Sequence, residues 1–268
     1  MRFFSPVEQI TLQLFSAIAI SSIMVVVFRL WRRLSLREVL IIGLCGIFEP
    51  GLTYLFGQHG LQLTDAGIVS VIFSSEAVVT VLLLALLRIE AITPMMFGLA
   101  AMAFAGVLLV VGADVTGGPR GSAFGYGLLA LSVIMASLYA IISTAFAVRG
   151  DVIFLVLIQQ IFALGLLGAY SAITGATIIP HIWSQIPPAQ WVNLIICGAA
   201  QFSVAFAVFQ LALRASPYRA VVFLNLIPLI GLLAGYVVLD ETLLASQALG
   251  VAITICALTM IAKHRTST

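Results

Sequence analysis

The chain has 268 residues, of which 62% are hydrophobic and 8% carry a charge. This composition leaves too little polar surface to coat a water-soluble globule of that length, so it excludes a soluble domain and predicts a polytopic membrane protein. The formal net charge of +2 says little by itself, because in such a chain the placement of the charges carries the information.

The apolar residues gather in spans of about 20 residues, each long enough to cross about 30 Å of hydrocarbon as an α-helix. A β-barrel would show alternating polar and apolar residues instead, so the predicted fold is all-α. The first span is not a signal peptide, because Glu8, Gln9 and Gln13 interrupt its start and no small-residue cleavage site follows. Breaks at charged residues, glycine or proline predict nine transmembrane helices, at 7–28, 39–57, 67–87, 95–113, 123–148, 152–173, 191–213, 219–239 and 246–262.

Positive charge in the short loops predicts how the chain crosses the membrane, because lysine and arginine are retained on the cytoplasmic side. The richest loop, 29–37, holds four arginines, and placing it inside puts ten of the twelve basic residues inside. We therefore expect an integral, multi-pass protein of the cell (inner or plasma) membrane, with its N-terminus outside and its C-terminus in the cytoplasm. The inside residues are Arg29, Arg32, Arg33, Arg37, Arg88, Arg149, Arg214, Arg219, Lys263 and Arg265, and the outside ones are Arg2 and Arg120.

A stretch of the first half recurs in the second half without a gap. Residues 37–64 align with residues 189–216, so that each position matches one lying 152 residues later. Self-similarity at a fixed spacing indicates that the chain consists of two related halves. The matching pairs are Cys45 with Cys197, Gly46 with Gly198, Gln58 with Gln210 and Leu61 with Leu213, and Glu49 falls on Gln201.

The two copies are predicted to cross the membrane in opposite directions. Four arginines precede the first copy, whereas the segment before the second copy, 174–189, contains no lysine or arginine. Inverted repeats of this kind are typical of secondary transporters, whose binding sites lie near the bilayer midplane where the halves meet. Weaker matches that extend the repeat are Gln13 with Gln160, Glu90 with Glu241 and Gly98 with Gly250.

The repeat predicts two domains, a first repeat at 1–118 with four helices and a second repeat at 119–268 with five. The counterpart of the additional helix would fall before residue 1, so one helix of a five-plus-five design is absent. A misassigned start codon, a real truncation and a true nine-helix variant are all open explanations. Met1 is followed directly by a helix that begins on the outer face, which favours the first explanation and predicts about 25 to 30 further codons upstream.

Several motifs match a known family of transporters. In the second half, Pro228 is followed after thirteen positions by Glu241, and Gly250 opens the last helix. In the first half the same frame is EAVVTVLLLALLRIE, which ends at Glu90 and is followed by Gly98. With these motifs the chain resembles the drug/metabolite transporter superfamily, in its EamA-type branch of ten-helix, five-plus-five inverted-repeat carriers.

The resemblance covers nearly the whole chain, although Ala77 stands where the family usually has proline. It implies export of a small polar metabolite, such as an amino acid or a related compound. It also implies a central cavity lined by four of the predicted helices, at 39–57, 67–87, 191–213 and 219–239.

Two glutamates lie near the middle of predicted spans, Glu49 in the second and Glu76 in the third. An ionised carboxylate that faced lipid at this depth would cost roughly 2.5–3.5 kcal/mol on insertion scales, so each should face a cavity or hold a proton. Such a group is a natural proton acceptor and donor, which makes both residues candidates for substrate binding or coupling. The alternative is a protonated side chain that hydrogen-bonds a neighbouring helix and only stabilises packing.

Gln201 strengthens the case for Glu49, because equivalent positions of inverted repeats point toward the same central region. Asn225 and Tyr54 are further candidates for substrate contact, although packing or a hydrogen bond between helices explains each of them more readily. Pro50 and Pro228 are expected to interrupt their helices at mid-depth and so to border the cavity, because proline lacks the N–H group that a helix needs.

No other chemistry is indicated. The three histidines, His59, His181 and His264, lie in predicted loops or the tail, without the spacing of metal ligands. The three cysteines sit in apolar runs and are interpreted as small buried hydrophobic residues. Phosphate loops and nucleophile elbows are absent from the sequence. We therefore expect no catalytic residue, no metal, no cofactor and no nucleic-acid partner.

The leading hypothesis is a secondary active transporter, an exporter of small polar metabolites whose partners are its substrate and the lipid bilayer. A non-transporting or truncated scaffold protein is the first alternative, suggested by the absent helix. A membrane-embedded enzyme is less favoured, because it would need clustered ionisable residues, and only Arg88 with Glu90 and Asp240 with Glu241 are found. The sequence leaves open the cargo, the coupling ion, the direction of transport and whether the chain forms a homodimer.

Overall fold

The computed structural model describes residues 4–64, 66–112, 122–147, 151–180, 183–238 and 244–263. These residues form helices joined by short loops, with no strand among the assigned elements of the described ranges. Seven of the helices described are long and apolar enough to span a membrane, and two shorter apolar helices lie at Pro94–Val110 and Pro217–Ile230. The predicted all-α polytopic membrane fold is confirmed. Outside the described residues lie Arg2, Arg120, Arg149, His181, Asp240, Glu241, His264 and Arg265.

Local sequence signals account for where several helices begin and end. At the first helix, Ser5 accepts a hydrogen bond from the Glu8 N–H, and the Glu8 carboxylate accepts one from the Ser5 N–H at 2.8 Å. This reciprocal capping box satisfies two backbone donors that a helix start leaves without helical partners. At Val152–Thr174 the helix ends at Gly175, whose φ of 73° lies in the left-handed region that glycine tolerates.

The chain folds as two compact units, and each unit contains segments from both halves of the sequence. Unit 1 comprises Met1–His59 and Ile142–Arg214, and unit 2 comprises Gly60–Ile141 and Ala215–Thr268. The helices α3 (Thr53–Gln62) and α7 (Ala123–Ala147) each pass from one unit into the other. The other elements of unit 1 are α1 (Pro6–Val27), α2 (Leu36–Gly46), η1 (Ile47–Leu52), α8 (Val152–Thr174), η3 (Trp183–Gln185), α9 (Pro188–Gly198), η4 (Ala199–Ala205) and α10 (Phe206–Ala215).

Within unit 1 the two halves pack in a reciprocal way. The first-half helix α1 packs against α9 and η4, and the second-half helix α8 packs against α2 and η1. Glycines allow both approaches, because a Cβ atom at Gly198 would overlap the Gln13 backbone and one at Gly46 would overlap the Gln159 backbone. Gly46 and Gly198 are paired by the sequence repeat, so related glycines occupy related helix crossings.

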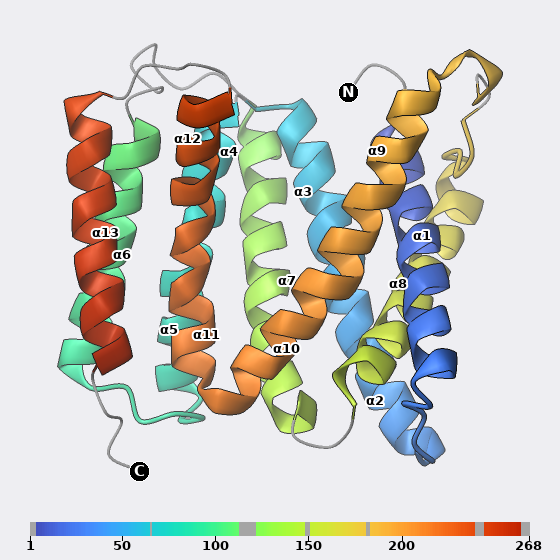
Figure 1. Cartoon of the computed structure of the whole chain (residues 1–268), viewed down its shortest axis with the longest axis horizontal. Helices are drawn as coiled ribbons and strands as arrows, with labels where there is room; N and C mark the ends of the chain where they lie inside the picture. Colours follow the sequence, from blue (N-terminus) through green and yellow to red (C-terminus); the bar gives the residue numbers. More distant parts are fainter. Residues whose placement is uncertain are drawn as a thin grey trace. The chain divides into compact units, whose positions relative to one another are not determined.

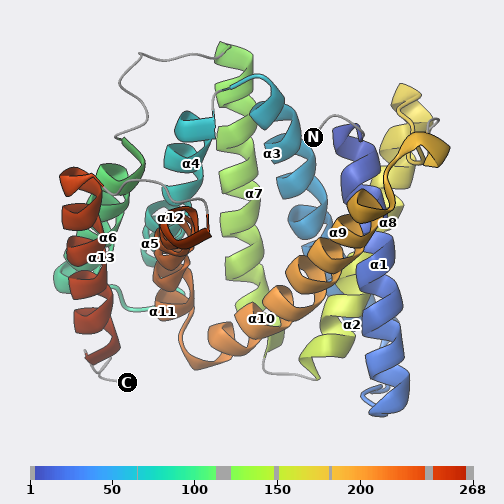
Figure 2. The ribbon, with the colours of Figure 1, turned by 45° about the horizontal axis from the view of Figure 1, so that its top comes forward.

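The related helices of unit 1 also run in opposite directions (Figures 1 and 2). In Figure 1, α1 descends while α8 ascends, and the path from α2 to α3 ascends while the path from α9 to α10 descends. This is the arrangement that the loop charges indicate for an inverted repeat.

Unit 2 is centred on the contact between α6 (Pro94–Gly112) and α13 (Ala245–Lys263). Gly106 and Gly250 lie at their crossing, where an added Cβ atom at either residue would meet the backbone carbonyl of the other. The Thr254 hydroxyl donates to the Ala103 carbonyl across the same crossing at 3.3 Å. The remaining elements are α4 (Ala66–Ser74), α5 (Glu76–Leu86), α11 (Pro217–Val222), η5 (Phe223–Asn225) and α12 (Leu226–Val238).

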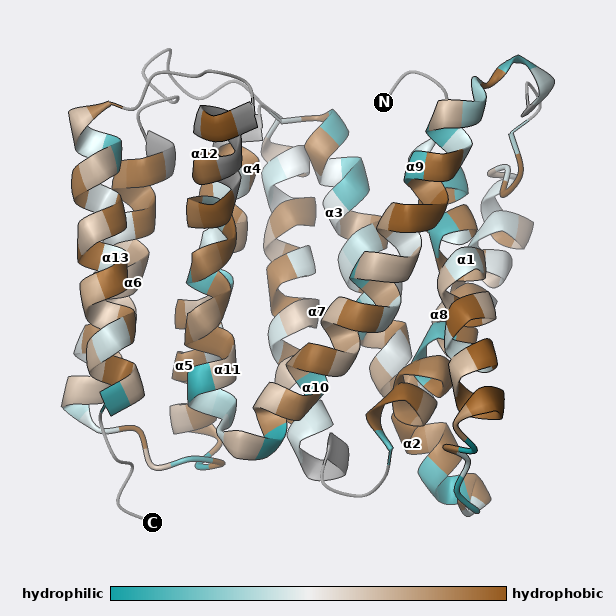
Figure 3. Cartoon of the chain, in the orientation of Figure 1, coloured by the Kyte–Doolittle hydropathy of each residue, from teal (hydrophilic) through white to brown (hydrophobic). Residues whose placement is uncertain are grey.

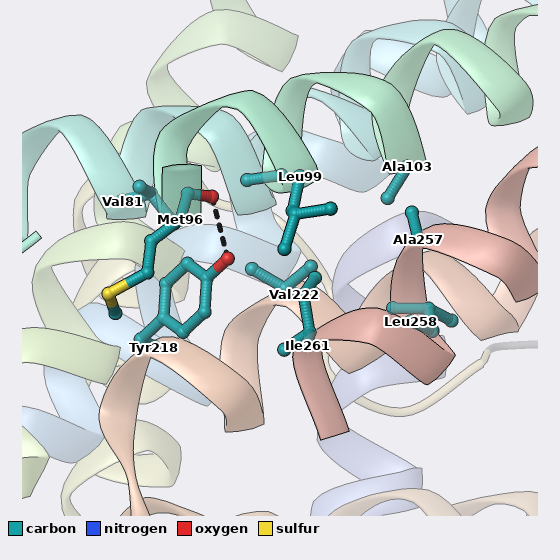
Figure 4. Packing of buried hydrophobic residues seen from close by; sticks show 10 residues of the cluster. Val81, Met96, Leu99, Ala103, Tyr218, Val222, Ala257, Leu258 and Ile261 are labelled. Carbon is teal, nitrogen blue, oxygen red and sulfur yellow. Dashed lines mark hydrogen bonds between the residues drawn. The ribbon is translucent and has the colours of Figure 1, made fainter. Parts of the chain in front are cut away.

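A cluster of buried side chains joins α5, α6, α11 and α13 within unit 2 (Figure 4). The Tyr218 ring lies inside this cluster, and its hydroxyl donates to the Met96 carbonyl at 2.6 Å. Inside a bilayer, packing and hydrogen bonds hold helices together, because lipid tails are as apolar as the side chains. Most of each helix is hydrophobic, and many of the hydrophilic residues lie near the helix ends and in the loops (Figure 3).

Candidate functional site

All four helices that the family resemblance places around the cavity are irregular midway along their length. In unit 1, η1 separates α2 from α3 with a kink at Glu49, and the π-helical segment η4 separates α9 from α10. In unit 2, a turn at Ser75 separates α4 from α5, and the 3₁₀ segment η5 separates α11 from α12. Irregular backbone at membrane depth is tolerated where it is buried in protein or lines a water-filled cavity. The breaks therefore mark where a polar site can be built.

Glu49 lies at the break in the first of these helices. Its φ of −146° and ψ of 127° are extended, in the middle of η1. It precedes Pro50, which is buried, and the peptide bond between the two residues is cis. Because Pro50 has no N–H group, the helical ladder is interrupted here, and the Thr53 N–H and hydroxyl both donate to the Phe48 carbonyl instead. The half-buried Glu49 side chain thus comes from a stretch that is not α-helical.

Gln201 occupies the equivalent position in the second copy. The segments η1 and η4 begin at Ile47 and Ala199, so Glu49 and Gln201 are each the third residue of their segment. The two copies are therefore irregular at the same register, through a kink at Glu49 in the first copy and a π-helical segment in the second. π-helical segments are rare and frequently occur at functional sites.

Tyr54 and Gln201 are brought together by the fold of unit 1. The Gln201 side-chain amide, on η4, donates to the Tyr54 hydroxyl, on α3, at 2.9 Å. The Tyr54 ring also lies edge-on to the Phe202 ring, with centroids 4.7 Å apart. Gln201 is exposed and Tyr54 is half-buried, so this polar pair lies on an accessible side of unit 1.

The candidate residues of unit 2 lie at its own helix breaks. Glu76 is the first residue of α5 and is half-buried, and its carbonyl accepts a hydrogen bond from the Thr80 hydroxyl at 2.8 Å. Asn225 ends η5 and is buried, and its side-chain amide donates to the Val222 carbonyl at 3.0 Å. Its Oδ1 atom has no hydrogen-bond partner within the described ranges. Pro228 is the third residue of α12, where the missing N–H group belongs to the first helical turn.

Two polar contacts of unit 1 involve residues that the sequence did not single out as site candidates. Gln160, on α8, is fully buried and donates from its side-chain amide to the Phe202 carbonyl at 2.6 Å. The hydroxyls of Ser21 and Ser203 lie 2.9 Å apart and are also buried. Only the match of Gln160 with Gln13 in the repeat could have drawn attention to the first contact.

Metal chemistry has no support in the part of the chain that the structure describes, where no group of three or more His, Cys, Asp and Glu side chains could hold a metal ion. His59, the histidine within the described ranges, contacts the Leu55 carbonyl through Nδ1 at 2.7 Å and lies near the Tyr170 ring.

A polytopic helical membrane protein whose helices are broken midway at polar residues has the architecture of a secondary transporter. The family model described as "EamA-like transporter family" matches residues 1–112 and 123–263. The match covers most of the chain, and the protein therefore belongs to the EamA-like transporter family. The resemblance to the drug/metabolite transporters found in the sequence is confirmed.

A solved structure described as "Crystal structure of protein" is similar over 97% of this chain and 89% of its own, with a TM-score of 0.80 and 17% sequence identity. At that identity the similarity shows a shared fold. No curated protein matches the chain in sequence.

Proposed function

We propose that this EamA-like transporter is a secondary active exporter of small polar metabolites, such as amino acids, and that Glu49 couples transport to protons. The observation that carries the proposal is Glu49 itself, a carboxyl group in an extended stretch between two halves of an apolar membrane helix. A carboxyl group held near the bilayer midplane is costly unless it has a function or a partner, and proton relays use such groups.

The hydrogen-bonded pair of Tyr54 and Gln201 supports a polar cargo. Both side chains can donate and accept hydrogen bonds, which suits amino and carboxylate groups of a metabolite. The Phe202 ring beside Tyr54 adds an apolar contact. Glu76 and Asn225, at the breaks of unit 2, are proposed as further contacts for the substrate.

The competing functions make different demands on these residues. A membrane scaffold without transport activity has no need of a carboxyl group at a helix break. A membrane-embedded enzyme would need ionisable groups gathered at one place, and Glu90 is instead engaged in binding the Ser216 hydroxyl and the Tyr218 N–H. The transport hypothesis is therefore preferred.

Glu49→Gln tests the coupling role, because it keeps the size and much of the hydrogen bonding of the side chain while removing its titration. The protein would be reconstituted in proteoliposomes, with a radiolabelled mixture of amino acids as the probe. We expect proton-gradient-driven flux to be lost in Glu49→Gln, while exchange of the labelled mixture without a gradient persists, because exchange requires no net proton release.

The matched control is Glu38→Gln, which changes the carboxyl group in the capping box of α2. Gradient-driven flux should survive there, since that side chain lies at a helix start and not at a break. Wild-type gradient-driven flux in Glu49→Gln would refute the coupling role. Loss of exchange as well would indicate that Glu49 binds the cargo.

A further inference from the structure

Gln160 donates a hydrogen bond to the backbone carbonyl of Phe202, which lies next to the proposed site residue Gln201. Its side chain, on α8, is 0% exposed, and its amide nitrogen donates to the Phe202 carbonyl at 2.6 Å. Phe202 belongs to η4 and directly follows Gln201 in the chain. The contact therefore connects a fully buried amide to the π-helical segment that presents Gln201.

The backbone of η4 explains why an outside donor is useful there. In a regular α-helix the Phe202 carbonyl would accept the N–H group four residues later, that of Phe206. In η4 the Phe206 N–H donates to the Ser203 carbonyl. Gln160 supplies a donor to the carbonyl at this irregularity, and side chains that enter the hydrogen-bond ladder of a helix are an established cause of local distortion.

Stability alone does not account for an amide at position 160. The Oε1 atom of Gln160 is buried and has no hydrogen-bond partner among the described residues. Burying an acceptor in that state costs free energy that a leucine or methionine of similar volume would avoid. An apolar residue would, however, remove the side-chain donor to the Phe202 carbonyl and would not fix the path of η4.

The path of η4 decides where the side chain of Gln201 points. The Phe202 ring packs against the Tyr54 ring, and the Gln201 amide donates to the Tyr54 hydroxyl. We infer that Gln160 is a positioning residue, which fixes the π-helical path of η4 through the Phe202 carbonyl and so aims Gln201 at Tyr54 in the substrate path. Whether this orientation of Gln201 matters for transport rests on the proposed function.

The first copy of the repeat differs at this point, because Pro50 stands where the second copy has Phe202, and this difference provides a control. In η1 the Thr53 hydroxyl, from the same membrane segment, donates to the Phe48 carbonyl. Gln13 is the repeat counterpart of Gln160 and is also buried, yet no hydrogen bond of its side chain is found within the described ranges. Gln13→Leu therefore removes a buried amide from the related helix α1 without removing a side-chain hydrogen bond to the backbone at the site.

Cross-linking tests the positioning without any substrate. Tyr54→Cys and Gln201→Cys would be combined after replacing the native cysteines, and the yield of a disulfide or short bis-maleimide link measured in membranes. We expect Gln160→Leu to lower the rate of cross-linking about fivefold, the effect of one lost hydrogen bond. Gln13→Leu should leave the rate unchanged. Gln160→Met serves the same purpose where Gln160→Leu is not recovered from the membrane.

An unchanged cross-linking rate in Gln160→Leu or Gln160→Met would overturn the inference. An equal decrease in Gln13→Leu would overturn it as well, because it would indicate general loosening of unit 1. Since no cargo is involved, these outcomes are independent of whether amino acids are transported.

A second measurement asks whether Gln160 acts through Gln201. Exchange of the radiolabelled amino acid mixture would be compared in Gln160→Leu, Gln201→Leu and the double variant. Residues that act through one another give non-additive effects, so the double variant should be no slower than Gln201→Leu. Multiplied losses in the double variant would contradict the positioning role, while loss of wild-type exchange itself would count against the proposed cargo only.

Discussion

Tyr218 connects separate segments of unit 2 through one side chain and its own backbone. Its hydroxyl donates to the Met96 carbonyl at 2.6 Å, and its N–H donates to the Glu90 carboxylate at 2.9 Å. Glu90 also accepts from the hydroxyl of Ser216, the residue that caps α11. The loop between α5 and α6 is therefore tied to the start of α11 by side chains that are not expected to touch the cargo.

Tyr218→Phe should lower the stability of the protein by about 1 kcal/mol, because it removes the buried hydrogen bond from the Tyr218 hydroxyl to the Met96 carbonyl. Thermal unfolding in detergent would measure this. Tyr126→Phe is the matched control, since the hydroxyl of Tyr126 is buried without a hydrogen-bond partner in the described part of the chain. Equal melting temperatures for Tyr218→Phe and the wild type would show that the Tyr218 hydroxyl contributes no net stability.

The sequence identified individual polar residues better than it identified their contacts. Glu49 is conspicuous because an acidic side chain stands in an apolar run, and Gln201 follows from the repeat. The bond from Gln201 to Tyr54 could not be predicted, because helices that are apolar on all sides do not reveal which face points inward. The hydrogen bond from Gln160 to the Phe202 carbonyl depends on the rotation of α8 about its axis, so it could not be predicted from the sequence either.

At the scale of whole elements, the crossing of α6 and α13 depends on small residues. Gly106 lies where a Cβ atom would come within 2.7 Å of the Gly250 carbonyl, whereas nothing lies within 4 Å of a Cβ atom at Gly98. Gly106 is therefore a packing contact, while Gly98 is open within the described structure. Without a hydrophobic driving force between helices, such close backbone approach supplies much of the association.

Gly106→Ala should destabilise the protein by about 1–3 kcal/mol, the usual cost of adding a methyl group to a packed contact. Gly98→Ala should be neutral or slightly stabilising, because alanine favours a helix more than glycine does. Thermal melting of the two variants in detergent gives the comparison. Equal melting temperatures for Gly106→Ala and Gly98→Ala would contradict this, because α6 and α13 would then accommodate the added methyl group at no cost in free energy.

Helix positions were predictable from the sequence, but helix irregularities were only partly so. Long apolar runs gave the membrane spans, and Pro50 indicated the break at η1. The segment η4 contains neither proline nor glycine, so nothing local indicates its π-helical backbone. Its geometry is accompanied by contacts from other helices, namely the Gln160 amide and the approach of α1 at Gly198. In the last of the broken helices, the irregularity at η5 precedes Pro228.

At the scale of the molecule, the two compact units each combine helices from both sequence halves. A first-half helix packs on a second-half helix in unit 1, as α1 does on α9, and in unit 2, as α6 does on α13. Neither unit could therefore form from one half of the chain alone. The opposite directions of α1 and α8 show the inversion within unit 1, while the loop arginines predict which membrane side each loop occupies (Figure 1).

Single cysteines test this orientation. The native Cys45, Cys197 and Cys256 are free thiols, and the last two are exposed, so all three would first be replaced by serine. Arg33→Cys would report on the arginine-rich loop, and Ser184→Cys on the segment before α9; both positions are exposed in the structure.

In intact cells, a membrane-impermeant maleimide should label Ser184→Cys and should reach Arg33→Cys only after permeabilisation, because arginine-rich short loops stay in the cytoplasm. The two positions precede the equivalent starts of the related helices α2 and α9, so they lie on opposite sides of the membrane and their labelling must differ if the repeat is inverted. Labelling of Arg33→Cys in intact cells with protection of Ser184→Cys would reverse the orientation and keep the inversion. Equal labelling of both in intact cells would place them on one side and contradict the inverted topology itself.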